Sequence, residues 1–394
     1  MKILMVNKFL YKNGGSETYM FKLGEQLAKT GHQVEYFGME HEGRCVSNSA
    51  DAYTSDMDFH NSGALQKIKM SLKTIYSKEA RIKIRLVLDK FQPDIVHLNN
   101  FNYQLTPSII LEIRQWEKES GKSVKIIYTA HDYQLICPNH MMYNNDKICE
   151  ACIGGKFINC TKGKCVHGSA LKSIIGTIEA EYWNRKNVYS QIDTIICCSE
   201  FMKKKLDSNP IFKNKTITLH NFVDMVEKKE TDKEDYILYF GRFAKEKGIE
   251  TLAGASSINF VCAGSGPMED TVNHSPNLEN IGFKTGTELE TLIRKAKCTV
   301  YPSIWYENCP FSVMESIMYG TPVVAANIGG IPELIDNNKT GILFEAGNIK
   351  EFENAINSII SDKAKADEMS KACLDYKFDA VSDYCTKLIK IYEN

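Results

Sequence analysis

Short apolar runs alternate with longer segments of mixed polarity along the chain. In the first half, these runs lie at residues 3–6, 33–37, 94–98, 124–129, 194–198 and 216–220. Nearly continuous apolar strands separated by helical segments are typical of a parallel sheet that helices cover on both faces. The pattern therefore predicts the α/β class.

The same alternation resumes after a break in composition. Residues 227–235 are rich in Lys, Glu and Asp, which predicts a linker between two domains. Beyond it, apolar runs recur at residues 236–240, 259–263, 298–302, 322–326 and 340–344. With 394 residues and 43% hydrophobic content, the chain can bury two cores. We predict an N-terminal domain at residues 1–222, a C-terminal domain at 223–377 and a final helix within 378–394.

The stretch from residue 306 to residue 326 carries the most distinctive pattern. It predicts a loop, a helix from Pro310 to about Tyr319, and a strand. The amides at the start of that helix, including those of Phe311 and Ser312, have no carbonyl partner within the helix, so they favour an anion such as phosphate. Glu307 and Glu315 flank this position.

Other strand ends also carry polar or glycine residues. Gly14 and Gly15 lie in a loop before a helix that we expect to start near Glu17, with Ser16 as its N-cap. His131 follows the strand at 124–129, at the edge where open α/β sheets bind ligands. A histidine hydrogen-bonded at a strand end would have the same spacing.

Two cations follow the first strand of the second domain. Arg242 and Lys247 lie in a loop ahead of a helix, and two cations so placed can neutralise a diphosphate. Glycines end the next strand at Gly264 and Gly266, which is a weak signal because turns after strands are often rich in glycine.

Taken together, these motifs resemble the retaining glycosyltransferases of family 4. The resemblance implies the GT-B fold, in which two Rossmann-like domains face each other across a cleft and the last helix packs back on the first domain. It departs from the family at Asn308-Cys309-Pro310, where one amide is absent. The catalytic residues that it implies are His131, Arg242, Lys247 and Glu307; the donor-binding residues are Gly14, Gly15, Gly264, Gly266, Phe283, Lys284, Phe311, Ser312 and Glu315.

The resemblance also implies the reaction. A hexose or N-acetylhexosamine would pass from a UDP- or GDP-sugar to a hydroxyl of a saccharide or lipid-linked acceptor with retention, in bacterial polysaccharide or glycolipid assembly. The chemistry would need no cofactor. Two alternatives stay open: a nucleotide-sugar epimerase of GT-B fold, which would isomerise its donor, and a noncatalytic nucleotide-sugar-binding protein, which would bind without turnover.

A cysteine-rich insertion spans residues 137–167. The spacing Cys149-x2-Cys152 with Cys160-x4-Cys165 is that of a structural, tetrahedral zinc site. A fifth cysteine, Cys137, leaves free or oxidised thiols as the alternative. The thirteen cysteines of the whole chain are an odd number, which favours reduced thiols and a cytoplasmic protein.

Charge and hydropathy limit which binding partners the sequence favours. The net charge of −1 gives no attraction to nucleic acid, and no apolar run is long enough to span a membrane. The basic, amphipathic segment at residues 61–90 is typical both of a helix on the inner face of the cytoplasmic membrane and of a solvated helix of the first domain. We therefore expect a cytoplasmic protein for which peripheral membrane contact is an open alternative.

Overall fold

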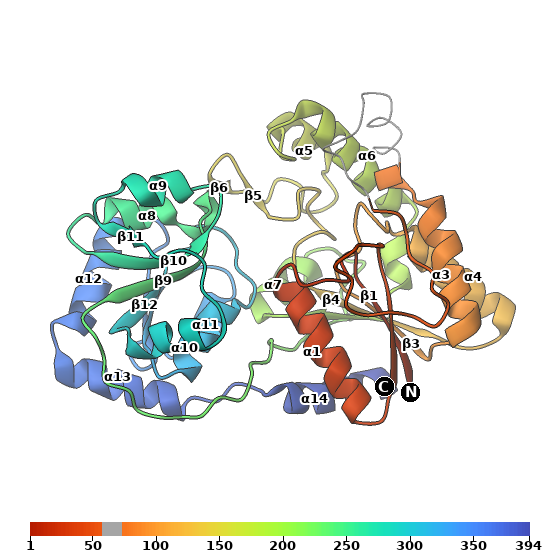
Figure 1. The fold of residues 1–394 in the computed structure, drawn as a ribbon. Helices are drawn as coiled ribbons and strands as arrows, with labels where there is room; N and C mark the ends of the chain where they lie inside the picture. The colour runs from red at the N-terminus through yellow and green to blue at the C-terminus, as the bar shows by residue number, and fades with distance from the viewer. Residues whose placement is uncertain (57–72) are drawn as a thin grey trace. The chain divides into compact units, whose positions relative to one another are not determined.

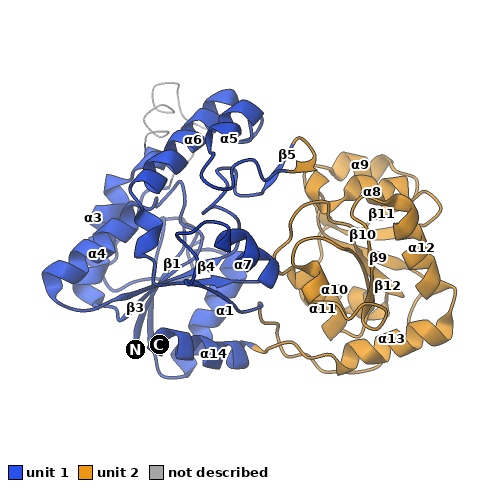
Figure 2. Ribbon diagram, turned by 180° about the vertical axis from the view of Figure 1, so that it is seen from behind, with its two compact units in different colours: residues 1–144, 149–220, 381–394 blue, residues 145–148, 221–380 orange. Residues whose placement is uncertain are grey.

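The apolar runs form the strands of two parallel sheets in the computed structural model, which describes residues 1–56 and 73–394. The chain divides into two units, coloured separately in Figure 2. Unit 1 comprises residues 1–144, 149–220 and 381–394, and unit 2 comprises residues 145–148 and 221–380. The observed division at Asn221 lies two residues from the expected boundary.

Unit 1 contains a parallel sheet in the order β2-β1-β3-β4-β7-β8. Its strands are β1 (Lys2–Val6), β2 (Gln33–Phe37), β3 (Ile95–Leu98), β4 (Lys125–Ala130), β7 (Thr194–Cys197) and β8 (Thr216–Thr218). Most residues of the inner strands are buried, because helices cover a parallel sheet on both faces, whereas the edge strands β2 and β8 are partly exposed.

Most helices of unit 1 connect successive strands of this sheet. The helices of this unit are α1 (Gly15–Lys29), α3 (Lys78–Phe91), α4 (Ser108–Ser120), α5 (Ile158–Gly163), α6 (Ala170–Arg185), η1 (Val188–Gln191), α7 (Glu200–Asp207) and α14 (Val381–Glu393). Between β4 and α5, the chain forms a small hairpin of β5 (Tyr143–Asn144) and β6 (Lys147–Ile148).

Unit 2 repeats the architecture with the strand order β11-β10-β9-β12-β13-β14. The strands are β9 (Ile237–Arg242), β10 (Phe260–Ser265), β11 (Leu278–Asn280), β12 (Cys298–Tyr301), β13 (Val323–Ala326) and β14 (Gly341–Phe344). The helices are η2 (Lys245–Lys247), α8 (Ile249–Gly254), α9 (Glu269–His274), α10 (Gly286–Lys295), α11 (Phe311–Met318), η3 (Ile331–Glu333), α12 (Ile349–Ile360) and α13 (Lys363–Asp375). The predicted α/β class is confirmed.

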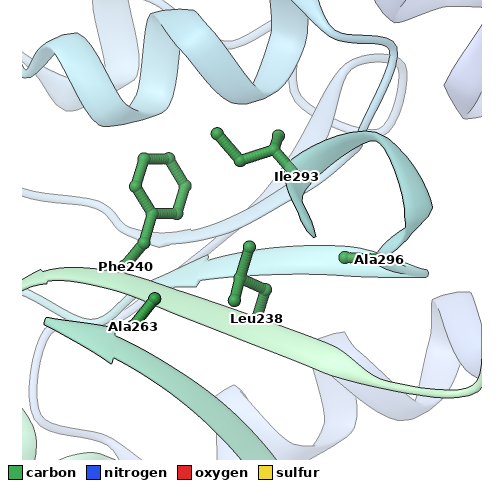
Figure 3. Packing of buried hydrophobic residues seen from close by; sticks show 5 residues of the cluster. All are labelled: Leu238, Phe240, Ala263, Ile293 and Ala296. Carbon is green, nitrogen blue, oxygen red and sulfur yellow. The ribbon is translucent and has the colours of Figure 1, made fainter. Parts of the chain in front are cut away.

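Part of the core of unit 2 lies between its sheet and α10 (Figure 3). Leu238 and Phe240 of β9 and Ala263 of β10 meet Ile293 and Ala296 at the end of α10. Leu238, Ile293 and Ala296 are fully buried. Burying one such aliphatic side chain stabilises the fold by about 1.5–3 kcal/mol, so this contact fixes the strand whose far end carries Arg242.

The last helix belongs to unit 1, although the preceding residues belong to unit 2. Helix α14 lies beside α1, as Figure 1 shows. Its Tyr384 hydroxyl lies 2.7 Å from the Tyr19 hydroxyl, and its Tyr392 hydroxyl lies 2.6 Å from His97 Nδ1. These hydrogen bonds are buried, so α14 completes the packing of the first sheet.

The basic segment predicted at residues 61–90 lies partly outside the described residues, which resume at residue 73. Its described part contains α3, whose arginines pair with acidic residues. Arg81 lies 2.6 Å from Glu112, and Arg85 lies 2.6 Å from Glu119. Both partners belong to α4, so α3 has the features of a solvated helix packed on its neighbour.

Candidate active site

The end of β9 and the turn after it position two cations. Arg242 is the last residue of β9, and it is exposed. Lys247 ends η2, and Gly248 follows it with a φ of 81°. A Cβ atom on Gly248 would lie 1.9 Å from the carbonyl oxygen of Pro302, so only glycine permits this approach. The turn therefore holds Lys247 against the loop that follows β12.

In that loop, Lys247 meets the carboxylate of Glu307. Lys247 Nζ lies 2.6 Å from Glu307 Oε1 and donates to the Tyr301 hydroxyl at 3.2 Å. The same Glu307 oxygen accepts hydrogen bonds from Ser303 Oγ and Trp305 Nε1, both at 2.6 Å. The fold thus brings together two predicted site residues that are 60 positions apart.

Burial and charge act in opposite directions on this ion pair. Glu307 is 5% exposed, and burial alone would raise the pKa of its carboxyl. The Lys247 ammonium and the hydrogen bonds from Ser303 and Trp305 outweigh burial, so the pKa of Glu307 is lowered. Burial would lower the pKa of Lys247, but Glu307 and Tyr301 raise it above its ordinary value. Both side chains are charged at neutral pH.

The loop after Glu307 leads directly into α11. This helix begins at Phe311, immediately after Pro310, and ends at Met318, one residue inside the predicted bounds at each end. The first amides of a helix lack carbonyl partners in a preceding turn, and the helix dipole is positive there. Glu315 lies within α11 and is half-buried. The helix start is therefore suited to an anion, and one carboxylate lies on each side of it in the sequence.

The glycines at the end of β10 have a packing role. A Cβ atom on Gly264 would lie 2.0 Å from the carbonyl oxygen of Gly241, and one on Gly266 would lie 2.5 Å from that of Phe243. Both glycines are therefore required where β10 passes the end of β9. Their predicted contact with a nucleobase stays a prediction.

Phe283 and Lys284 follow β11. The Phe283 ring is 72% exposed, so it is accessible to a planar ligand. Lys284 Nζ lies 2.6 Å from Glu288 of α10. Its ammonium group is already paired, and a role for it at the nucleobase stays a prediction.

In unit 1, the glycine loop joins β1 to α1. The expected helix start near Glu17, with Ser16 as N-cap, is wrong: α1 begins at Gly15, and Gly14 is its N-cap. Tertiary partners explain the difference. Ser16 Oγ accepts a hydrogen bond from Asn100 at 3.0 Å, and Glu17 is buried and accepts one from Asn7 at 2.9 Å.

His131 lies directly after β4, as predicted. Its Nε2 lies 3.0 Å from Oδ1 of Asn99, which follows the neighbouring strand β3. The ring packs edge-on against Tyr19, with 4.9 Å between the ring centroids. Burial lowers the pKa of His131 to about 4, and Asp132 acts weakly in the other direction. The imidazole is therefore neutral at physiological pH, and it is suited to hydrogen bonding rather than to binding a phosphate by charge.

Comparisons with known proteins bear on both units. Residues 13–227, more than half of the chain, match the family described as Glycosyltransferase Family 4, and residues 222–374 match Glycosyl transferases group 1. This chain is a family-4 glycosyltransferase. The family predicted from the sequence motifs is thus confirmed. The enzyme is a transferase of GT-B fold.

Three similar proteins illustrate the relationship. The glycosyltransferase is 24% identical to an uncharacterized 42.6 kDa protein in the cps region of Klebsiella pneumoniae, covering 85% of this chain and 87% of the relative. It is 30% identical to a GDP-mannose-dependent alpha-mannosyltransferase of Corynebacterium glutamicum, and the match covers 39% of this chain and 38% of the relative. The structure of Anabaena HepE in complex with UDP matches with a TM-score of 0.65 and 15% identity, over 100% of each chain.

Sequence reasoning missed several residues of the glycosyltransferase that line these strand ends. Tyr301, Ser303 and Trp305 surround the Lys247–Glu307 pair, and Asn7 and Asn99 bond the predicted residues of unit 1. All five follow or end an apolar run. The rule that placed His131 at the end of a strand would have found them if it had been applied to every strand.

The cysteines of the glycosyltransferase's insertion are free thiols. Cys149, Cys152, Cys160 and Cys165 lie around one small cavity together with Cys137. In the described part of the chain, no three His, Cys, Asp or Glu side chains are arranged so that they could hold a metal ion as they stand.

Proposed function

We propose that this glycosyltransferase moves a hexose or N-acetylhexosamine from a nucleotide-sugar to an acceptor hydroxyl with retention at the anomeric carbon. The observation that carries the proposal is the charged pair of the partly buried Lys247 and the buried Glu307, which lies in the loop that leads into α11. A nucleotide-sugar presents a diphosphate, which needs positive charge and oriented amides. Arg242, Lys247 and the α11 start supply both at the carboxyl edge of one sheet.

The chemical step follows from the leaving group. The bond between the anomeric carbon and the diphosphate oxygen breaks, and the electron pair stays on that oxygen. The acceptor oxygen bonds to the same face of the sugar, and its proton passes to the departing phosphate oxygen. Arg242 and Lys247 stabilise the charge that develops on the diphosphate.

Glu307 has a positioning role in this scheme. Its Oε1 receives hydrogen bonds from Lys247, Ser303 and Trp305, so the carboxylate is held in place and its charge is neutralised. A carboxylate bound in this way is a poor nucleophile. It instead fixes the Lys247 ammonium and leaves its second oxygen for a sugar hydroxyl.

The proposed donor is a UDP- or GDP-sugar. The HepE structure contains UDP, and the Corynebacterium relative is named as GDP-mannose-dependent. Both lie in the same family or fold, so each supports one nucleotide. The Klebsiella relative in a cps region supports a role in polysaccharide or glycolipid assembly.

The first test measures donor binding and transfer on the same protein. We expect one sugar among the UDP-, GDP- and ADP-linked series to raise the melting temperature. We propose that the Glu315 carboxylate binds the ribose of the donor nucleotide, so Glu315→Ala should lose this shift. Arg242→Ala should lower turnover by about 100-fold or more and leave the fold intact.

Lys295→Ala serves as the control, because Lys295 of α10 only pairs with the exposed Glu234. This variant should bind the donor and transfer the sugar as the unaltered chain does. Full activity of either site variant would overturn the assignment. The anomeric configuration of the product, read by NMR, tests retention. Conversion of the donor to an isomer without acceptor would instead indicate an epimerase, and binding without turnover a noncatalytic protein.

We also propose that the acceptor is lipid-linked and that unit 1 contacts an anionic membrane surface through α6. Leu171, Ile174 and Ile178 of this helix are 66%, 41% and 50% exposed, whereas its buried face includes Ser173 and Thr177. An apolar face turned outward, with Lys172 beside it, matches an interfacial helix. None of the described helices is long and apolar enough to cross a membrane.

Sedimentation with vesicles tests this contact. Vesicles that contain anionic phospholipid should retain the chain, and Ile174→Glu with Ile178→Glu should release it. Ile82→Glu places one such charge at a 65% exposed isoleucine of α3 and should have no effect. Equal retention of all three proteins would exclude α6 as the contact.

A further inference from the structure

The five cysteines of the insertion lie around one cavity. Cys137, Cys149, Cys152, Cys160 and Cys165 all line a single cavity of about 10 Å³. That volume admits about one sphere of the size of a water molecule. Scattered free cysteines have no reason to meet at a cavity of this size, whereas ligands of one ion do.

The insertion has little regular structure. Its regular structure is limited to the two-residue strands β5 and β6 and the six-residue helix α5. Its hydrophobic cluster of fully or nearly buried residues consists of Cys152, Phe157 and Cys160. A segment with so small a core is usually stabilised by a cross-link or a metal.

We propose that Cys137, Cys149, Cys152 and Cys165 bind one structural Zn²⁺ ion in this cavity. Cys149 and Cys152 form a short chelating pair, which is typical of zinc sites. Cys137 begins a turn in which the backbone amides of Asn139 and Met142 donate to its sulfur. Amides directed at a sulfur stabilise a thiolate, so Cys137 has the surroundings of a ligand.

Cys160 has a different environment and is the thiol that we exclude. It lies on α5, is fully buried and packs with Phe157. Its side chain also interacts with the Cys165 thiol and with the Thr177 hydroxyl of α6. This cysteine therefore serves the contact between α5 and α6. The zinc set inferred from the structure includes Cys137 in place of Cys160 of the sequence-based set.

The electrostatics of the surrounding chain fit a tetrathiolate zinc site. Such a site has a net charge of −2. Four lysines of residues 151–178 offset part of that charge. These lysines are Lys156, Lys162, Lys164 and Lys172. Glu150, which lines the cavity, is itself paired with Lys205.

Binding must change the protonation and the arrangement of the thiols. In the free thiols, burial raises the pKa of Cys137 to about 11 and of Cys152 and Cys165 to about 12. The sulfurs are then protonated, and the described side chains do not yet form a metal-binding group. As Zn²⁺ enters, four S–H bonds are replaced by four Zn–S bonds, and four protons pass to solvent.

The site would fix a loop that reaches the edge of the first sheet. His140 follows Cys137 in this loop and lies 3.5 Å from the Asp132 carboxylate, next to His131. The His140 ring stacks on Tyr103, with 4.9 Å between the centroids. A zinc ion bound through Cys137 therefore holds His140, and through it Asp132, in place.

The test measures the zinc content of the purified full-length chain by inductively coupled plasma mass spectrometry. We expect about one zinc per chain, and near none in Cys152→Ser and Cys137→Ser. Cys160→Ser alters a thiol on the same cavity wall and should keep its zinc. Cys45→Ser, at an exposed cysteine, should also keep it.

Each other outcome overturns a defined part of the proposal. Loss of zinc in Cys160→Ser would overturn the ligand set. Iron with inorganic sulfide, a disulfide between these cysteines, or no metal would overturn the zinc site itself. Where a variant fails to fold, a chelator applied to the unaltered chain decides: four additional thiols should become reactive, and the melting temperature should fall.

Discussion

At the scale of single residues, the Lys247–Glu307 pair determines how the candidate site is organised. Sequence placed both residues in the site, but it treated them separately: Lys247 as a cation for a diphosphate, and Glu307 as a carboxylate that flanks the helix start. In the fold, the two side chains share one hydrogen-bond network with Ser303 and Trp305. A change at either residue should therefore affect the other.

Glu307→Gln tests this coupling. The amide keeps the shape of the side chain but leaves the Lys247 ammonium without its counter-charge. Stability should fall by about 1–3 kcal/mol, and transfer should fall by more than donor affinity. Urea unfolding and steady-state kinetics measure the two effects. Glu288→Gln, which breaks the exposed pair with Lys284, should change stability by less than about 0.5 kcal/mol. Equal losses in both variants would refute the coupling.

Two histidines of unit 1, the buried His97 and the half-buried His131, predict a loss of stability in mild acid. Burial lowers the pKa of His97 to about 3 and that of His131 to about 4. The unfolded chain takes up these protons from about pH 6.5 downward, whereas the folded chain does not until about pH 4. Stability should therefore fall as the pH drops through this window, by up to about 1.4 kcal/mol per pH unit for each histidine.

Urea unfolding at several pH values measures this dependence. His131→Gln should have a shallower slope between pH 6.5 and 4 than the unaltered chain, and the same change at exposed His274 serves as the control. The comparison is between variants because burial raises the pKa of Glu179 to about 8, which acts in the opposite direction. An unchanged slope in His131→Gln would contradict the prediction.

At the scale of elements, the turn between β9 and α8 shows why a short motif has its composition. The sequence predicted only a loop that carries Arg242 and Lys247. The structure adds two constraints at Gly248, a positive φ and a close approach to the Pro302 carbonyl. The glycine therefore determines where Lys247 lies relative to β12.

Gly248→Ala should displace this turn. Gly347 has the same φ of 81°, but a Cβ atom there meets nothing within 4 Å. Gly347→Ala therefore measures the backbone strain alone, about 1 kcal/mol. Gly248→Ala should cost more and should also weaken nucleotide binding, which Gly347→Ala should not. Calorimetric melting and nucleotide titration distinguish the two, and equal effects would show that the contact with Pro302 is unimportant.

At the scale of the whole molecule, the chain returns to unit 1 at its end. The amphipathic pattern of residues 378–394 predicted a helix, and the partners of that helix came from the family resemblance. In the structure, Tyr384 and Tyr392 of α14 form hydrogen bonds with Tyr19 and His97, respectively. The stability of unit 1 therefore depends on residues that follow unit 2 in sequence.

Truncation after Ala380 should destabilise unit 1 selectively. It removes buried side chains of α14 and leaves the polar atoms of Tyr19 and His97 without these partners. Amide hydrogen exchange should accelerate in β1, β3 and β4, while β9 and β12 keep their protection. The double variant Tyr384→Phe and Tyr392→Phe keeps the helix and should show a smaller effect in the same strands. Uniform acceleration in both units would contradict this division.

The sequence by itself determined the α/β class, the position of most strands and the family, because apolar runs and local motifs depend on neighbours in the chain. It also placed His131 directly after a strand, and Arg242, Lys247 and Glu307 in loops that precede helices. Only the tertiary structure decided which of these meet. Lys247 meets Glu307, His131 meets Asn99, and five cysteines share one cavity, because such contacts depend on strand order and helix packing rather than on spacing. The start of α1 was missed for the same reason: Ser16 and Glu17 have distant partners that local capping rules do not include.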